Sequence, residues 1–308
     1  MAITAAMVKD LREMTGAGMM DCKKALAATD GDMDKAVEFL REKGLAAAEK
    51  KAGRIAAEGI CETAVSEDGK VAAIVEVNSE TDFVAKNDTF RSFVKAVVNQ
   101  AMVTENTEID AFLAEKWSLD ASKTVKEELS SQIAVIGENM NIRRFQKVVA
   151  ENGFVESYIH GGGRIGVLVE FETTVCNDIA KEAAKNVAMQ IAAISPKYVQ
   201  RTEIPEDYIS HEREILKAQA MNENTGKPEN IIEKMIEGRL NKELKEICLV
   251  DQVYVKDGDL TVQKYLETVA KEIGAPITVK SFVRFETGEG IEKKSENFAE
   301  EVAKQMGQ

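Results

Sequence analysis

The sequence has few of the residues that build metal centres and disulfide frameworks. Four cysteines lie far apart without a CxxC pair, and the 308 residues include two histidines, His160 and His211. A zinc site is therefore not expected, whereas free thiols in a reducing compartment are. No apolar run is long enough for a membrane span, and the amphipathic N-terminus lacks the pattern of a signal peptide. A cytoplasmic location is the resulting expectation.

Motifs of nucleotide-binding and hydrolytic enzymes are also missing. There is no GxxxxGK loop, and neither histidine belongs to a recognisable nucleophile motif. The glycine-rich run 161–166 precedes a strand rather than a helix, so it is interpreted as a hairpin turn and not as a nucleotide loop. Acidic residues are abundant, but their number alone selects no catalytic pair. We therefore predict a protein that is not an enzyme and that needs no cofactor or metal.

The composition is that of a globular chain with a sizeable core. Hydrophobic residues make up 44% of the sequence and charged residues 30%, and the length allows about two domains. The net charge of -13 disfavours direct nucleic-acid binding, because an acidic surface repels phosphates. The same charge tolerates a basic protein partner but does not identify one.

The N-terminal region, residues 1–54, predicts a compact bundle of three short helices followed by a linker. Thr4 is a candidate N-cap for the first helix, and glycine-containing breaks separate the three helices. Gly44 stands where a C-terminal cap of the third helix is expected. The Ala/Lys-rich stretch that follows, residues 46–54, is interpreted as a helical linker.

An internal repeat organises the rest of the chain. The segment that begins at Gly59 resembles the segment that begins at Gly153, and both predict a strand, a tight turn and a second strand. A helix follows each hairpin, and a late strand closes each unit; the expected helices are 88–102 and 178–193, and the expected late strands are 141–149 and 277–286. The fold class is therefore α+β, with two core units, 55–150 and 151–288, that each place helices on one face of a small antiparallel sheet.

The second unit contains an insertion at about residues 206–247. Its apolar positions predict two helices, 206–222 and 229–247, joined by a short turn, and hence an antiparallel helical hairpin that projects from the body. The patterning leaves open whether this hairpin is a simple packing arm or a contact surface. The last part, 289–308, predicts a C-terminal helix with Phe298 and Val302 one turn apart, which is a candidate for docking on a partner.

Residues 78–87 have no counterpart in the second copy, which passes into its helix by a shorter route. An element that occurs in one copy is not required by the shared fold. It places Asp82 and Phe83 side by side in an apparent loop. On physical grounds alone, an ordinary core position is favoured for Phe83.

Five stretches of the sequence, in order from end to end, resemble signatures of the elongation factor Ts family. They are residues 11–26, residues 81–86, residues 136–144, His160 together with 163–167, and residues 285–293. One such motif could arise by chance, whereas five in order would be very unusual. His160 and Arg164 are separated by one glycine more than in the family pattern. The sequence therefore leaves open whether His160 contacts a partner.

The resemblance implies a guanine-nucleotide exchange factor that binds elongation factor Tu and accelerates GDP release. By resemblance, the N-terminal bundle has a fold like the ubiquitin-associated domain and contacts the nucleotide-binding domain of that partner through Arg12, Met19, Met20 and Lys23. The wedge that disturbs the Mg²⁺ site of the partner consists of Thr81, Asp82, Phe83 and Val84. His160 is expected to touch another domain of the partner. The helical hairpin and the terminal helix are expected to extend the contact or to support self-association.

Two other classes of function remain as alternatives. A helical adaptor that binds only through its N-terminal bundle would need residues 1–54 alone. An enzyme that uses His160 and the glycine run would turn over a small substrate without a protein partner.

Overall fold

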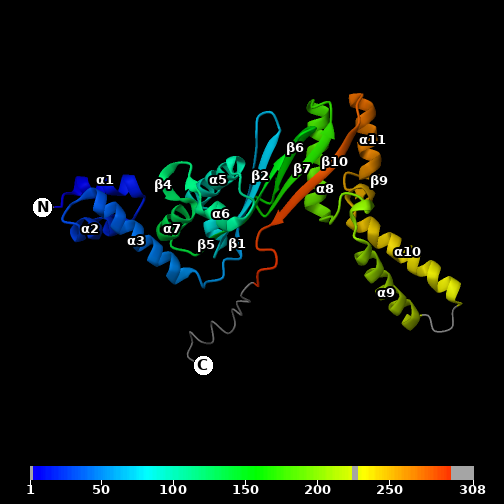
Figure 1. The fold of residues 1–308 in the computed structure, drawn as a ribbon, viewed down its shortest axis with the longest axis horizontal. Coiled ribbons are helices and arrows are strands. Elements are labelled where there is room, and N and C mark those ends of the chain that lie inside the picture. The colour runs from blue at the N-terminus through cyan, green and yellow to red at the C-terminus, as the bar shows by residue number, and fades with distance from the viewer. Residues whose placement is uncertain (1–2, 224–227, 293–308) are drawn as a thin grey trace.

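The structure, a computed structural model, describes residues 3–223 and 228–292. Figure 1 shows an elongated molecule, with the N-terminal helices at one end, small sheets in the middle and a helical hairpin at the other end. The predicted α+β class is confirmed, while the predicted C-terminal helix lies outside the described residues. Among the described helices, none combines the length and the apolar character that crossing a bilayer requires.

The N-terminal bundle consists of α1 (Ala5–Thr15), α2 (Met19–Ala28) and α3 (Met33–Lys51). Thr4 caps α1 as predicted, because its side chain accepts a hydrogen bond from the Met7 amide at 3.3 Å. A small apolar core joins the three helices; its fully buried members include Leu11, Cys22, Leu26 and Ala36.

The predicted end of the third helix at Gly44 is wrong, because α3 continues to Lys51. Gly44 lies where α3 crosses α7 (Val125–Ile136), and a Cβ atom placed on Gly44 would sit 3.7 Å from the Cβ of Ala134. The missing side chain therefore lets two helices approach closely rather than ending one of them. Near the end of α3, Lys51 donates to the Ile133 carbonyl at 3.3 Å, so α3 connects the bundle to the first core unit.

The first core unit contains a three-stranded antiparallel sheet in the order β1-β2-β5, with helices packed on one face. The strands of this sheet are β1 (Glu58–Val65), β2 (Val71–Ser79) and β5 (Met140–Val149). The other elements of the unit are α4 (Asp82–Ala85), α5 (Asp88–Val103), α6 (Ile109–Ala114), the ribbon β3 (Lys116–Trp117) and β4 (Asp120–Thr124), and α7.

The second core unit repeats this plan with the sheet order β10-β7-β6. Its sheet is formed by β6 (Gly153–His160), β7 (Ile165–Thr173) and β10 (Ile277–Glu286). The sheet packs against α8 (Asp178–Ile194) and α11 (Val262–Ile273), and a ribbon of β8 (Val253–Tyr254) and β9 (Asp257–Thr261) precedes α11.

The repeat extends further along the chain than the sequence analysis predicts. Both α7 and α11 have 12 residues, begin at a threonine N-cap and end at a glycine with positive φ, which is Gly137 in α7 and Gly274 in α11. A two-stranded ribbon precedes each of them, although neither ribbon nor either helix was predicted. The last strand of each sheet also has a register shift at a corresponding position.

The two sheets meet through the hairpins that the repeat predicts. Cys61 on β1 donates its amide to the Gly163 carbonyl at 2.7 Å, and Val155 on β6 donates to the Gly69 carbonyl at 2.8 Å. A Cβ atom on Gly163, whose φ is +112°, would stand 2.7 Å from the Cβ of Ile60. A glycine is therefore required where the β6–β7 turn is pressed against the first sheet.

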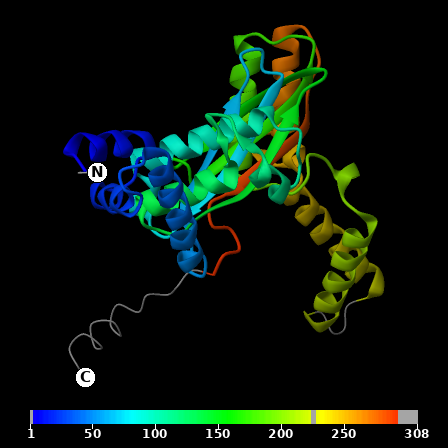
Figure 2. The same cartoon turned by 60° about the vertical axis from the view of Figure 1, so that its left-hand side comes forward.

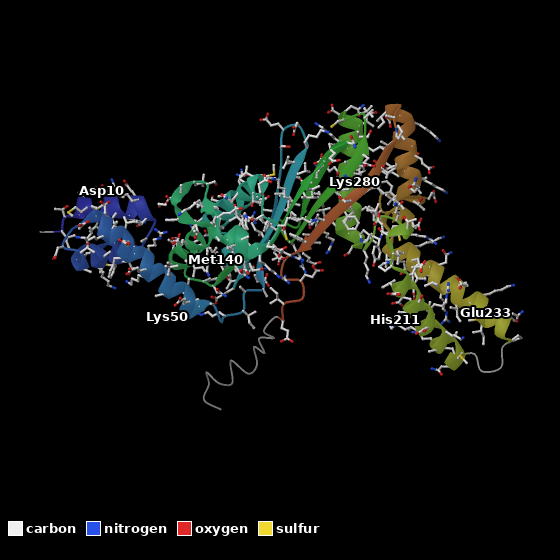
Figure 3. All side chains as sticks on the ribbon, viewed as in Figure 1. Asp10, Lys50, Met140, His211, Glu233 and Lys280 are labelled. Carbon is white, nitrogen blue, oxygen red and sulfur yellow. The ribbon has the colours of Figure 1, made fainter. Side chains whose placement is uncertain are left out.

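The insertion is a helical hairpin of α9 (Glu206–Glu223) and α10 (Glu229–Ile247), as predicted. It has a small core of its own, and Figure 2 shows it projecting from the body. The buried members of this core are Leu216, Ala220, Ile236 and Leu240. Figure 3 places Glu233 on the hairpin and Asp10 on the N-terminal bundle at opposite ends of the molecule.

Candidate partner-binding site

A short helix, α4, fills the segment between β2 and α5 that distinguishes the first unit. Thr81 is its N-cap, and the Thr81 hydroxyl accepts a hydrogen bond from the Val84 amide at 3.3 Å. Asn87 then caps α5 by accepting from the amides of Thr89 and Phe90. Because both ends of the segment are capped, residues 81–87 form a defined projection, which we call the tip.

Phe83 is the most exposed large apolar side chain among the described residues, with 81% of its surface accessible. The expectation from physical grounds alone, that Phe83 is a core anchor, is therefore wrong. Ala85 is buried and Val84 is half-buried against the first core, so these two residues anchor α4. Anchoring on one side of a single helical turn leaves Phe83 on the other side, where its ring is exposed to solvent.

Asp82 stands beside this ring as a carboxylate. Its side chain is 55% exposed and forms an ion pair of 2.7 Å with Lys86, one helical turn away. The hydrogen bond from Lys86, followed by the charge of Lys86, lowers the pKa of Asp82 below its ordinary value. Asp82 is therefore ionised at neutral pH, and it can accept hydrogen bonds from a partner once Lys86 moves aside.

Glu138 supports the tip from the turn between α7 and β5. Its carboxylate accepts from the Thr81 amide at 3.0 Å and from the Thr81 hydroxyl at 2.7 Å. Glu138 belongs to the third family-like stretch, but nothing in the sequence around it indicates a role for this residue. No local pattern in the sequence shows that residues 57 positions apart are bonded, so only the fold identifies this contact.

His160 ends β6 and is exposed, and the hydroxyl of Tyr158 lies 3.0 Å from its Nδ1 atom. The turn that follows is close to the base of the tip, because Arg91 on α5 donates to the Gly162 carbonyl at 3.0 Å. The glycine run is thus the turn of the β6–β7 hairpin, as interpreted from the sequence. The fold thus bonds the turn after His160 to α5, the helix that follows the tip, although 77 positions separate His160 from Phe83.

The N-terminal candidates form a separate group on α1 and α2. Met19 and Met20 are 57% and 63% exposed, and Arg12 and Lys23 are exposed as well. Lys23 follows Met19 by one helical turn, so apolar and basic groups share one surface. Figure 1 places α1 and α2 at one end of the molecule and α5, which follows the tip, near the middle. The predicted residues therefore lie on at least two separate surfaces.

Comparison with known proteins gives the family of this chain. A family model described as Elongation factor TS matches residues 80–289. The chain belongs to the elongation factor Ts family. It is 57% identical over 306 residues to elongation factor Ts from Clostridium novyi (strain NT), with 99% of both chains covered. It is also 57% identical to elongation factor Ts from Clostridium kluyveri (strain ATCC 8527 / DSM 555 / NBRC 12016 / NCIMB 10680 / K1) over 304 residues and from Clostridium perfringens (strain SM101 / Type A) over 305, again with 99% of both chains covered.

Membership in the elongation factor Ts family gives the chain a role in translation elongation. The match to the family model begins at Glu80, directly before the tip, and ends at Glu289. The N-terminal bundle lies outside that match but inside the matches to the full-length relatives. The predicted family resemblance is thus confirmed along nearly the whole chain.

Proposed function

We propose that this chain binds GDP-bound elongation factor Tu and promotes release of the GDP, so that GTP can bind. The observation that carries the proposal is the exposed ring of Phe83 on a short helix that is capped and anchored. The ring and the Asp82 carboxylate act as a wedge near the Mg²⁺ site of the partner. No covalent step is required, because an exchange factor needs only to bind the nucleotide-free partner more tightly than the nucleotide-bound one.

The energetics require a wide contact in addition to the wedge. Burying one phenylalanine side chain contributes about 1.5–3 kcal/mol, which corresponds to about one or two decades in an equilibrium constant. Phe83 alone is therefore insufficient for strong exchange. The proposal assigns the remaining docking energy to Met19 and Met20 with Arg12 and Lys23, and to the turn at His160.

The same binding energies make the action reversible. A GTPase holds GDP through loop amides and Mg²⁺, and a wedge that distorts this site weakens the nucleotide. By linkage, an incoming nucleotide weakens the exchange factor by the same factor, which releases the factor for another cycle. The chain can therefore act at substoichiometric amounts. A cytoplasmic location and self-association through the hairpin stay predictions.

The parts of the chain contribute to this function in different ways. In the proposal, residues 1–54 dock on the nucleotide-binding domain, residues 55–150 carry the tip, and residues 151–288 carry His160 and the hairpin. Residues 289–308 extend the contact. Neither an adaptor restricted to residues 1–54 nor an enzyme that uses His160 explains why the tip carries an exposed phenylalanine.

Release of labelled GDP from elongation factor Tu, measured by stopped flow with substoichiometric chain, tests the proposal. We expect a variant that combines Asp82→Ala and Phe83→Ala to slow release by about ten- to a hundredfold, because the wedge is lost. Its thermal midpoint is expected to stay at that of the wild type, since Phe83 is 81% exposed.

The matched control is Ile179→Ala, which removes a 37% exposed apolar side chain from the first turn of α8 in the second unit. We expect this variant to release GDP at the rate of the wild type. Normal release by the folded double variant would remove the wedge from the mechanism.

A further inference from the structure

Two glutamates bond reciprocally across the base of the tip. Glu138 accepts the amide of Thr81, the residue after Glu80, at 3.0 Å. Glu80 accepts the amide of Asn139, the residue after Glu138, at 2.5 Å. Each carboxylate therefore satisfies a backbone donor of the other segment, and we call these four residues the glutamate clamp. Hydrogen bonds to a carboxylate are stronger than those between neutral groups, so the clamp is a firm link.

The clamp acts directly on the helix that carries Phe83. The Thr81 hydroxyl donates to Glu138 at 2.7 Å and accepts from the Val84 amide at 3.3 Å. Glu138 therefore fixes the rotamer of the residue that caps α4. A helix of four residues has too few internal hydrogen bonds to be stable alone, so its direction depends on this cap and on the buried Ala85.

The second unit supplies an internal comparison. Ser79 pairs with Met140 at the end of the first sheet, and Thr173 pairs with Ile277 at the end of the second. Counting back from these pairs, Ala275 and Pro276 occupy the positions of Glu138 and Asn139. Alanine has no carboxylate and proline has no amide hydrogen, so neither half of the clamp can form.

The tip is missing from the same unit. Eight positions separate Ser79 from the N-cap Asn87, whereas four separate Thr173 from the N-cap Asn177. The difference equals the four residues of α4. The shared fold therefore forms without a clamp, and within this chain the clamp occurs together with the tip.

The clamp is also bonded to the linker from the N-terminal bundle. The side-chain amide of Asn139 donates to the Arg54 carbonyl at 2.7 Å, and the guanidinium of Arg54 lies 3.5 Å from the carboxylate of Glu80. Three chain segments are thus joined at one place, namely the linker, the start of the tip and the turn after α7. This arrangement relates the position of the tip to the point where the N-terminal bundle is attached.

We propose that Glu138 is a positioning residue, which holds α4 so that Phe83 points outward before the partner arrives. The contribution of Glu138 to the rate of GDP release rests on the proposed function. Its effect on the conformation of the tip, in contrast, can be measured in the free protein. Preorganising an inserted group lowers the ordering cost of binding. Glu138 is thus expected to raise the maximal rate of exchange more than the affinity for the partner.

Amide hydrogen exchange in the free, full-length chain tests the clamp without any partner. In Glu138→Ala we expect the amides of Thr81 and Val84 to exchange about tenfold faster or more, because both lose a fixed acceptor. Glu138→Gln keeps one oxygen and is expected to fall between the wild type and Glu138→Ala. Glu272→Ala, which removes an exposed carboxylate near the end of α11, is the matched control and leaves both amides unchanged.

GDP release with excess chain then tests the consequence. We expect Glu138→Ala to lower the maximal release rate about tenfold and to change the half-saturating concentration by no more than about twofold. Glu138→Gln should recover part of the rate. Unchanged exchange of the Thr81 and Val84 amides in Glu138→Ala overturns the proposal, whatever the release rate.

Faster amide exchange with an unchanged maximal rate also overturns the proposal, provided that Phe83→Ala slows release in the same assay. If Phe83→Ala does not slow release, the wedge is removed from the proposed function, and the amide exchange alone then decides whether Glu138 holds the tip. The two failures are therefore distinguishable.

Discussion

The two core units are built on one plan but differ at the places where the chain leaves that plan. Each has a β-hairpin, a helix, a ribbon, a second helix and a closing strand. Apart from the short helix α6 before the ribbon of the first unit, the first unit adds α4 between its hairpin and α5, and the second inserts the α9–α10 hairpin between α8 and its ribbon. Both additions sit at connections, which tolerate insertions more readily than strands and core helices do. The common scaffold is thus kept while each unit presents a different projection.

A buried glutamate at equivalent positions of the central strands shows the same divergence. Glu76 is fully buried and accepts from Arg143, Arg144 and the Gly288 amide, the last at 2.8 Å. The Gly288 contact links the first unit to the segment that follows β10. Glu170, its counterpart, is bonded to Lys280 and Ser281 within its own sheet. One glutamate therefore joins two units, and the other supports one.

The largest expected effect comes from exchanging these glutamates for glutamine. Glu76→Gln is expected to lower the free energy of unfolding by about 2 kcal/mol, because it leaves two arginines without their carboxylate. Glu170→Gln is expected to cost less than half as much, since the Lys280 side chain is 42% exposed and water can replace its partner. Urea denaturation of the two variants measures the difference. Equal costs would show that the two sites are not energetically distinct.

A smaller effect is expected at the glycines that end α7 and α11, where the units should behave alike. Gly137 and Gly274 have φ of +92° and +70°, and beyond the adjoining backbone no heavy atom of the described residues lies within 4 Å of a Cβ built on either. Alanine at either position is therefore strained only by its backbone, at a cost of about 1 kcal/mol. Thermal unfolding of Gly137→Ala and Gly274→Ala should give similar shifts. A clearly larger shift for one of them would break the equivalence of the two helices.

The smallest effect is a dependence of stability on pH. Burial alone would raise the pKa of Glu76, but the Gly288 amide, the Asn78 side chain and Arg144 outweigh it and lower the pKa below its ordinary value of 4.5. The stability that this ionisation contributes is complete above about pH 4.5 and is lost as the pH falls through the lowered pKa.

The stability difference between the wild type and Glu76→Gln should therefore shrink as the pH falls from about 7 to about 3. Urea denaturation at several pH values measures this difference, and other carboxylates cancel because both proteins contain them. A difference that stays constant over this range would contradict the assigned pKa direction.

Much of the architecture could be predicted from the sequence because it depends on local signals. The spacing of apolar residues and the short turn between them gave the α9–α10 hairpin within a residue, and the repeat gave both sheets. The prediction at Gly44 failed because glycine has two structural uses. It can end a helix, or, as here, its missing side chain can let a second helix pack closely against the first. The sequence of α3 alone does not contain α7, so it could not distinguish these cases.

The candidate site was predicted in part. The family resemblance selected the tip. The general preference of phenylalanine for the protein interior, in contrast, predicted a buried Phe83, and the structure shows it exposed. The glutamate clamp was missed because its two bonds join segments that are nearly sixty positions apart. A hydrogen bond of that kind has no periodic signature.

The sequence by itself determined α1, α2, α5, α8, the α9–α10 hairpin, the repeated β-hairpins and the family, because these follow from patterns within short stretches of chain. The tertiary structure alone decided that α3 continues past Gly44, that Phe83 faces solvent, and that Glu138 holds the residue that caps its helix. Each of these depends on which distant segment lies alongside. That neighbour is fixed by the packing of the whole fold rather than by the preferences of the residues concerned.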